Sequence, residues 1–286
     1  NRRTNALAHG LIEAGISAGD NVAIMCRNHR GFIEAIVALS KIGANALLLN
    51  TSFAGPQMVE VVDREKTDAI IYDAEFARLA GAALNGRQGF VAWHRREQVS
   101  DITLEQLIAQ GNPGSLSPPK TAGKVVILTS GTSGTPKGAL RSQPKSLDPA
   151  VSLLSAIPLR SRDRTLIAAP LFHSWGFAHL TLGLLMSSTY ILQRRFDPEE
   201  TLAAIQNSRA TVLGVVPVMM QRILELPAKT RRRYDTSSLR VVAASGSALP
   251  GELATNWMDE FGDTLYNLYG STEVAWATIA PPDDLG

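Results

Sequence analysis

Short apolar runs typical of strands alternate with amphipathic, helix-length segments along almost the whole chain. The runs at residues 21–26, 45–50 and 68–73 are each followed by a segment whose apolar residues recur at helical spacing. Strands that alternate with helices are typical of parallel sheets joined by crossover helices. The sequence therefore predicts an α/β fold, including helices near residues 57–66 and 178–186.

A stretch rich in proline, glycine and serine, residues 111–124, interrupts this alternation. Such composition is typical of a connection between lobes. We expect a first α/β lobe at residues 1–118 and a second at residues 119–286. The chain does not begin with Met and opens on a mid-helix pattern, so we expect a piece of a longer protein.

The composition excludes several classes of protein. The chain has 286 residues, 45% of them hydrophobic and 19% charged, with a formal net charge of +2, which argues against a nucleic-acid-binding protein. Residues 165–193 contain no charged Asp, Glu, Lys or Arg, but they include Pro170 and two histidines, which favours buried core over a membrane span. The only cysteine, Cys26, lies in an apolar run, so we expect a core thiol in a reducing, cytoplasmic setting.

The run of small polar residues after the strand-like residues 125–128 predicts an anion-binding loop. Its glycines permit positive φ angles, so successive backbone N–H groups can converge on one anion. Lys137 adds a positive charge, and a polyphosphate fits these donors best. It stands between Pro136 and Gly138, unlike the lysine of a Walker A motif. The glycines are Gly131, Gly134 and Gly138, and the hydroxyl residues are Thr129, Ser130, Thr132, Ser133 and Thr135. A flexible Ser/Gly linker is the alternative.

This loop resembles the phosphate loop of the adenylate-forming superfamily, which holds acyl-CoA synthetases, luciferases and the adenylation domains of peptide synthetases. A second motif, NLYGSTE at residues 267–273, resembles the adenine-binding YG-x-TE motif of the same superfamily. Taken alone, it reads as a turn with a solvated acid. The resemblance implies that Tyr269 stacks on adenine, Thr272 reaches a phosphate and Glu273 holds Mg²⁺. The remaining nucleotide contacts that it implies are Asn267, Gly270 and Ser271.

The motif PLFHSWGF at residues 170–177 bears on the substrate. By itself, His173 reads as a hydrogen-bonded core histidine. Acyl-CoA synthetases and luciferases carry Phe-His at this place, whereas amino-acid-activating domains carry Phe-Asp. The resemblance therefore implies a carboxylic acid without an α-amino group, whose carboxylate lies beside His173. Trp175 or Phe177 would wall or gate the acyl pocket. Some long-chain members have their gating Trp at the spacing where Phe177 stands here.

Two strand ends complete the expected site. The turn ASGSALP at residues 244–250 resembles the superfamily's SGA-type turn, which passes between adenine and the acyl group. It would bring Ser245, Gly246 and Ser247 to the nucleotide, with Gly246 also facing the acyl group. Gly214 and Val216 resemble a wall of the acyl pocket. A plain strand-to-helix turn is the alternative for each.

Two basic clusters have no assigned role: Arg160, Arg162 and Arg164, and Lys229 with Arg231, Arg232 and Arg233. A solvated loop is the default interpretation of each. The alternatives are contact with the 3′-phosphate of CoA or with an anionic membrane surface.

The resemblance implies two Rossmann-like lobes with parallel-rich sheets, forming the N-terminal part of an acyl-CoA synthetase of the fatty-acid type. ATP, Mg²⁺ and CoA would be required, with Lys137, His173, Thr272 and Glu273 as catalytic residues and Thr129 as a second candidate beside the metal. A C-terminal lid domain would supply the remaining groups, so this chain alone is expected to be inactive. The alternatives are a ligase that loads a carrier protein, a luciferase-like enzyme and a non-catalytic nucleotide-binding module.

Overall fold

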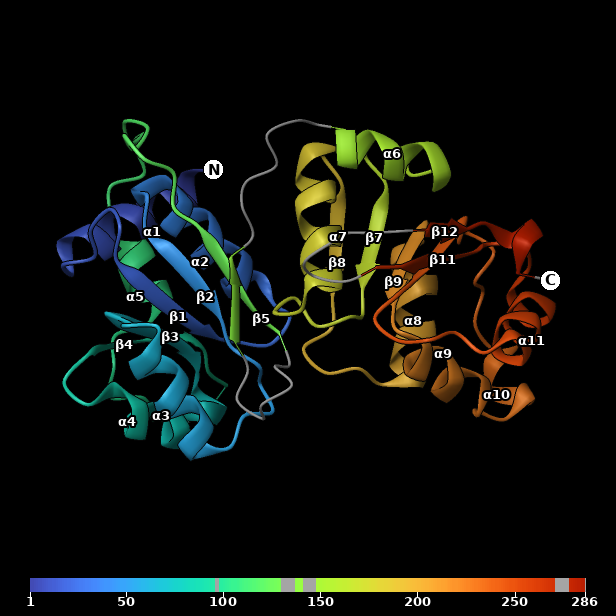
Figure 1. Ribbon diagram of the computed structural model, residues 1–286, viewed down its shortest axis with the longest axis horizontal. Helices are drawn as coiled ribbons and strands as arrows, with labels where there is room; N and C mark the ends of the chain where they lie inside the picture. The colour runs from blue at the N-terminus through green and yellow to red at the C-terminus, as the bar shows by residue number, and fades with distance from the viewer. Residues whose placement is uncertain (96–97, 130–136, 141–147, 271–277, 286) are drawn as a thin grey trace. The chain divides into compact units, whose positions relative to one another are not determined.

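The structure is a computed structural model that describes residues 1–95, 98–129, 137–140, 148–270 and 278–285 (Figure 1). The chain divides into two compact units, Asn1–Gln143 and Pro144–Gly286. Each unit contains one six-stranded sheet with its own helices. The α/β fold with two parallel-rich sheets is therefore confirmed.

In the first unit the strand order is β4-β3-β1-β2-β5-β6. All neighbours are parallel except β5 and β6, which form an antiparallel pair. The strands are β1 (Asn21–Met25), β2 (Asn45–Leu48), β3 (Ala69–Asp73), β4 (Gln88–Trp93), β5 (Val125–Thr129) and β6 (Lys137–Leu140). The helices are α1 (Arg2–Glu13), α2 (Arg30–Ile42), α3 (Gly55–Arg64), α4 (Ala77–Leu84) and α5 (Leu104–Gln110), with a 3₁₀ turn η1 (Ala74–Phe76).

In the second unit the order is β12-β11-β10-β9-β7-β8, parallel except for β11 and β12. The strands are β7 (Arg164–Ile167), β8 (Thr189–Leu192), β9 (Val212–Val215), β10 (Val241–Ala244), β11 (Leu265–Tyr269) and β12 (Thr278–Ala280). The helices are α6 (Asp148–Ala156), α7 (Ser174–Leu185), α8 (Pro198–Ser208), α9 (Pro217–Leu224), α10 (Ala228–Arg231) and α11 (Gly251–Phe261), with a 3₁₀ turn η2 (Pro282–Asp284).

The second sheet is covered on both faces, because successive side chains of a strand point to opposite sides. On β9, Leu213 belongs to the core cluster shared with α8, α9 and α11, whose largest buried side chain is Trp257. Its neighbour Val212 belongs to the other cluster, with Trp175 of α7 and Leu153 of α6. Continuous apolar strand sequences are the result of burial on two faces.

The structure differs from the sequence expectation at the lobe boundary. β5 pairs in parallel with β2, in the register Ala46↔Val125 and Leu48↔Ile127, so it completes the first sheet. The boundary expected between residues 118 and 119 precedes this strand, whereas the compact units divide between Gln143 and Pro144. Composition marked residues 111–124 as a loop, but strand pairing decides to which sheet the following strand belongs.

Two helices begin earlier than expected. α3 spans Gly55–Arg64 rather than residues 57–66, and α7 spans Ser174–Leu185 rather than residues 178–186. In α7 the first turn contains Trp175, Gly176 and Phe177, a combination with low helix propensity that tertiary burial overrides. Among the described residues, no helix is long and apolar enough to cross a membrane.

Candidate functional site

The carboxyl edge of the second sheet collects several polar turns predicted from the sequence. β7, β9, β10 and β11 are sheet neighbours, as shown by the pairs Ile167↔Gly214, Ala244↔Val215 and Ala244↔Asn267. The segments that follow them carry the PLFHSWGF motif, Val216, the ASGSALP turn and Gly270. In open parallel sheets, ligands bind outside the carboxyl ends of the strands. The second unit therefore has a candidate binding edge.

His173 lies at the N-terminus of α7, as its N-cap residue in extended conformation. Its ring packs against Phe172 at a centroid distance of 4.4 Å, while part of its surface stays open to solvent. Loss of hydration around the rest of the ring lowers the pKa of His173 below its usual 6.5. The imidazole is therefore neutral at pH 7, a state that can still donate one hydrogen bond.

The residues expected to wall the acyl pocket lie close together. Trp175 is buried, and its indole Nε1 donates a hydrogen bond of 2.9 Å to the carbonyl oxygen of Val215. Gly246 has a φ of +96°, which favours glycine, and a Cβ there would lie 3.3 Å from Cγ1 of Val216. Gly214 precedes Val215 on β9. One wall of a pocket can therefore be built from α7, β9 and the turn after β10.

Phe177 does not share this wall with Trp175. Both side chains are buried. Two residues along an α-helix correspond to a rotation of about 200°, so Phe177 points away from the helix face that carries Trp175. Of the two aromatic candidates from the sequence, Trp175 is the one that lies against β9.

The adenine-binding candidates end the second sheet. Tyr269, at the end of β11, is 70% exposed, so a ring face is open for stacking. Asn267 is half-buried, and its Oδ1 is buried without a hydrogen-bond partner among the described residues. After β10, Ser245 is buried, while Gly246 and Ser247 are exposed.

The phosphate-loop candidate belongs to the first unit, where it connects β5 to β6. The two ends of the loop are paired, with Thr129 opposite Lys137 and Leu128 opposite Gly138. A hairpin of this kind holds both ends of the loop at one place. The other loop residues and the end of the adenine motif lie outside the described residues: Ser130, Gly131, Thr132, Ser133, Gly134, Thr135, Ser271, Thr272 and Glu273.

His179 was not singled out from the sequence. It is 5% exposed, and burial lowers its pKa to about 4. Its ring meets Trp175 edge-on at a centroid distance of 4.6 Å. A Cβ on Gly214 would lie 2.7 Å from its Cδ2. The Nε2 atom is buried without a hydrogen-bond partner in the part of the chain that the structure describes.

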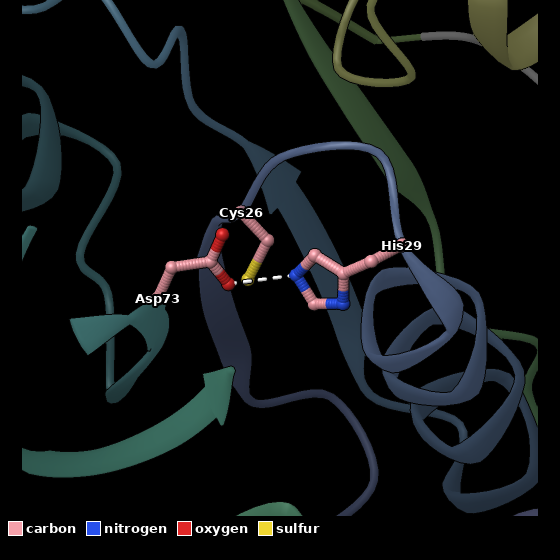
Figure 2. A group of neighbouring side chains, drawn as sticks. All are labelled: Cys26, His29 and Asp73. Carbon is pink, nitrogen blue, oxygen red and sulfur yellow. Dashed lines mark hydrogen bonds and ion pairs between the residues drawn. The ribbon is translucent and has the colours of Figure 1, made fainter. Parts of the chain in front are cut away.

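A second polar cluster lies in the first unit, at the carboxyl ends of β1 and β3 (Figure 2). Ligand atoms of Cys26, His29 and Asp73, all buried, lie within 4.8 Å of one another, a donor set that could suit a metal ion. However, His29 Nδ1 accepts a hydrogen bond from the Gly31 N–H at 3.0 Å, and Nε2 lies 2.7 Å from Asp73 Oδ1. Because both ring nitrogens are engaged, we interpret the cluster as structural. The thiol of Cys26 is a core thiol, as expected.

The basic cluster at residues 229–233 is partly used within the fold. Arg231 bonds the carbonyl oxygen of Leu224 at 2.6 Å and Glu260 at 2.9 Å. Arg233 lies 3.6 Å from Glu199. The guanidinium of Arg231 therefore holds α10 against neighbouring helices, which weakens the case for a ligand contact at that residue.

An open parallel sheet with polar turns at neighbouring carboxyl ends defines a class of ligand-binding α/β domain. The chain belongs to the AMP-binding enzyme family, whose model matches residues 1–285. A feruloyl-CoA synthase of Amycolatopsis sp is 32% identical over 96% of this chain and 53% of its own length. The 3-[(3aS,4S,7aS)-7a-methyl-1,5-dioxo-octahydro-1H-inden-4-yl]propanoyl:CoA ligase of Mycobacterium tuberculosis is 30% identical over 97% of this chain and 57% of its own.

Among solved structures, the amide bond synthetase McbA from Marinactinospora thermotolerans superposes with a TM-score of 0.85 at 26% identity. The match covers 99% of this chain and 57% of McbA. The chain thus spans about half the length of the curated relatives it matches, such as the feruloyl-CoA synthase, at 53%.

Proposed function

We propose that this chain is the nucleotide- and acid-binding part of an ATP-dependent acid–CoA ligase. The observation that supports it best is a family match over residues 1–285 in which the TSGTSGTPKG loop and the YGSTE motif are both intact. In the proposed reaction, the substrate carboxylate attacks the α-phosphate of ATP and pyrophosphate leaves. The thiolate of CoA then attacks the acyl carbon of the acyl-AMP, and AMP leaves.

The first step is difficult because the negatively charged substrate carboxylate must approach the polyphosphate of ATP, which carries more negative charge. Preorganised donors that face the charge developing in the transition state lower this barrier. The loop from Thr129 to Gly138, with Lys137, would supply such donors to the phosphates. Tyr269 would stack on adenine, and neutral His173 would donate a hydrogen bond to the substrate carboxylate.

Mg²⁺ is part of the proposal. A carboxylate and phosphate oxygens form the donor set that this ion prefers, and Glu273 supplies the carboxylate. Thr129 is the second candidate beside the metal, and Thr272 would contact a phosphate. When bound, the ion would offset the negative charge of the polyphosphate.

We infer that the acid lacks an α-amino group, because His173 stands where the amino-acid-activating members carry a carboxylate. The names of the two relatives describe acids with rings, one a feruloyl group and the other a bicyclic diketone. Because this chain is similar in sequence to these two relatives, we favour a ring-bearing acid over the fatty acid expected from the sequence motifs. A fatty acid remains the second candidate, supported by the motif resemblance alone.

The test uses the natural full-length protein with ATP, Mg²⁺, CoA and a panel of ring-bearing and straight-chain acids. We expect acid-dependent pyrophosphate release and acyl-CoA formation. Lys137→Met and Glu273→Gln should each lower kcat/KM by at least about 100-fold, since the first removes a positive charge that faces the phosphates and the second removes the carboxylate that would hold Mg²⁺. Lys124→Met, an exposed lysine at the entry to β5, should leave the rate unchanged.

A folded full-length protein that binds ATP but activates no acid would contradict the proposal and favour a non-catalytic module. The molecule that receives the acyl group from acyl-AMP must be identified by a separate product assay. The reason is that McbA, an amide bond synthetase by its title, shares the fold. Pyrophosphate release without acyl-CoA would mean that the acyl-AMP goes to an amine or to a carrier protein instead of CoA.

A further inference from the structure

The amino edge of the second sheet is rich in arginine. β7, β9 and β10 are parallel neighbours, in the register Thr165↔Val212 and Val241↔Val212, so they begin side by side. Asp163 lies at this edge and is already paired with Arg240 at 2.6 Å. The arginines that begin or lead into these strands are Arg160, Arg162, Arg164, Arg209 and Arg240. The candidate binding edge lies at the carboxyl ends of the same strands, so a ligand at the amino edge would occupy a separate site.

An open pocket with a volume of about 470 Å³ lies at this edge, and we call it the amino-edge pocket. Its volume falls within the ~300–1,000 Å³ that is typical of small-molecule sites. The lining is polar and contains no acidic side chain. It consists of Arg164, Asn207, Ser208, Arg209, Thr211 and Ser238. The pocket therefore presents positive charge to a ligand without supplying the opposite charge itself.

Both arginines of the pocket keep donors for a further partner. Arg209 is exposed, and its guanidinium makes no hydrogen bond or ion pair with the residues that the structure describes. Its charge reaches Asp235, whose pKa is lowered first by hydrogen bonds from Ser237 and then by this arginine. Arg164 donates from Nε to the carbonyl oxygen of Ser208, which leaves the two terminal nitrogens of its guanidinium. Two guanidinium groups with such donors suit an anion that has several oxygens.

The serine hydroxyls of the pocket offer the opposite function. Ser208 donates its hydroxyl hydrogen to the carbonyl oxygen of Ala204 at 2.6 Å, and Ser238 donates to that of Ala210 at 2.8 Å. Because a hydroxyl has only one hydrogen, both oxygens can only accept from a ligand. A ligand that meets them must bring its own O–H or N–H donors beside its anionic group.

We infer that the amino-edge pocket is a second binding site, which takes a phosphate ester that also carries hydroxyl groups. Arg164 and Arg209 hold the phosphate, since the planar guanidinium binds phosphate oxygens two at a time. Ser208 and Ser238 accept hydrogen bonds from the hydroxyls of the ligand. Sugar phosphates have this chemistry, and so do the inositol phosphate headgroups of lipids. The inference does not depend on the proposed ligase function.

The test is calorimetric titration of the natural full-length protein with ribose 5-phosphate, and with ribose as the phosphate-free probe. We expect ribose 5-phosphate to bind and ribose not to bind. Arg209→Gly should weaken the binding of ribose 5-phosphate at least about tenfold, because it removes one of the two guanidinium groups. The backbone of Arg209 has a φ of +48°, which favours glycine, so the variant should unfold at the same temperature as the natural protein or a higher one.

Arg162 provides a matched control. It is exposed, it has a φ of +64°, and it does not line the amino-edge pocket. Arg162→Gly therefore makes the same change of charge and backbone outside the pocket, and it should alter the Kd by less than about twofold. Arg209→Lys keeps the positive charge but loses the two-pronged donor, so it should retain part of the affinity.

A second arm identifies the source of the phosphate. Vesicles of phosphatidylcholine, with and without phosphatidylinositol 4-phosphate, are tested for binding by sedimentation. Vesicle binding that requires the inositol phosphate and is lost in Arg209→Gly would support the site and identify a lipid headgroup as its ligand. Binding of ribose 5-phosphate without vesicle binding would support the site and identify a free small molecule.

Three results would overturn the inference. The first is a folded natural protein that binds neither ribose 5-phosphate nor the vesicles. The second is binding that Arg209→Gly does not weaken, or that Arg162→Gly weakens equally. The third is an increase in the KM for CoA in Arg209→Gly, because the pocket would then belong to the co-substrate. The first two leave the ligase proposal untouched, and a natural protein that activates no acid would leave the binding test unaffected.

Discussion

Two histidines of α7 show how burial decides the chemistry of a side chain. Loss of hydration lowers the pKa of both His173 and His179, the latter to about 4. His173 keeps access to solvent at the N-terminus of the helix, where a substrate can reach it. His179 is enclosed against Gly214. Both are neutral at pH 7, so neither is expected to form an ion pair with a carboxylate.

The buried state of His179 predicts a stability that depends on pH. A histidine in the unfolded chain titrates near 6.5, whereas His179 in the folded chain titrates at about 4. Between these values the unfolded chain binds a proton that the folded chain does not, so the free energy of unfolding decreases as the pH falls from 6.5 to 4. The contribution of His179 is on the order of 3 kcal/mol, at about 1.36 kcal/mol per pKa unit.

Urea unfolding at pH 7 and at about pH 4.5 would measure this effect. We expect His179→Leu to lose less stability on acidification than the natural protein does. The remaining loss would include His173, whose pKa is shifted in the same direction. Identical losses in the variant and the natural protein would show that His179 does not contribute.

Single residues also mark the limit of what the sequence could predict. The motif around His173 was recognisable, and its place at the carboxyl edge of the sheet follows from the strand before it. His179 had no such signal, because its burial depends on Gly214, which lies far along the chain on β9. That Trp175 lies against β9 likewise became visible only from its hydrogen bond to Val215.

At the scale of elements, the start of α2 is fixed by its own N-cap side chain and by a carboxylate at the end of β3. His29 is the N-cap residue, accepting a hydrogen bond from the Gly31 N–H through Nδ1. Its other nitrogen lies 2.7 Å from Asp73 at the end of β3 (Figure 2). Asp73 also accepts a hydrogen bond from the Arg27 N–H at 3.1 Å. The cluster therefore ties a helix terminus to the carboxyl ends of β1 and β3.

Removing this link should destabilise the first unit more than removing an ordinary helix cap. His29→Ala deletes the cap and takes a partner from a fully buried carboxyl group, so we expect a loss of about 3 kcal/mol. Thr103→Ala removes the N-cap hydrogen bond to the Gln106 N–H on α5, for which about 1 kcal/mol is typical. Urea unfolding followed by circular dichroism would compare them, and equal losses would contradict the structural role of the cluster.

Most parallel strands were predictable because they are apolar runs between helices. The two antiparallel strands, β6 and β12, were not predicted. β6 (Lys137–Leu140) follows a run rich in glycine and hydroxyl residues, and its strand character comes from pairing with β5. β12 has three residues and depends on its pairing with β11. Pairing partners of this kind cannot be read from local composition.

At the scale of the whole molecule, the motifs on which the proposed function rests are divided between the two units. The phosphate-loop candidate connects β5 to β6 in the first unit, whereas the acyl-pocket and adenine candidates follow strands of the second. The family match spans both units, residues 1–285, without interruption. The order of these motifs along the chain was readable from the sequence, whereas the division of the strands between two sheets needed the structure.

The most direct test of this account is calorimetric titration of the natural full-length protein with a non-hydrolysable acyl-adenylate mimic that carries a 4-hydroxycinnamoyl group. We predict one binding site, and Tyr269→Ala should weaken binding by about tenfold, since stacking of a base on an aromatic ring contributes about 1–3 kcal/mol. Circular dichroism must first show that both proteins are folded. The absence of binding by the folded natural protein would contradict the proposed adenylate-forming function.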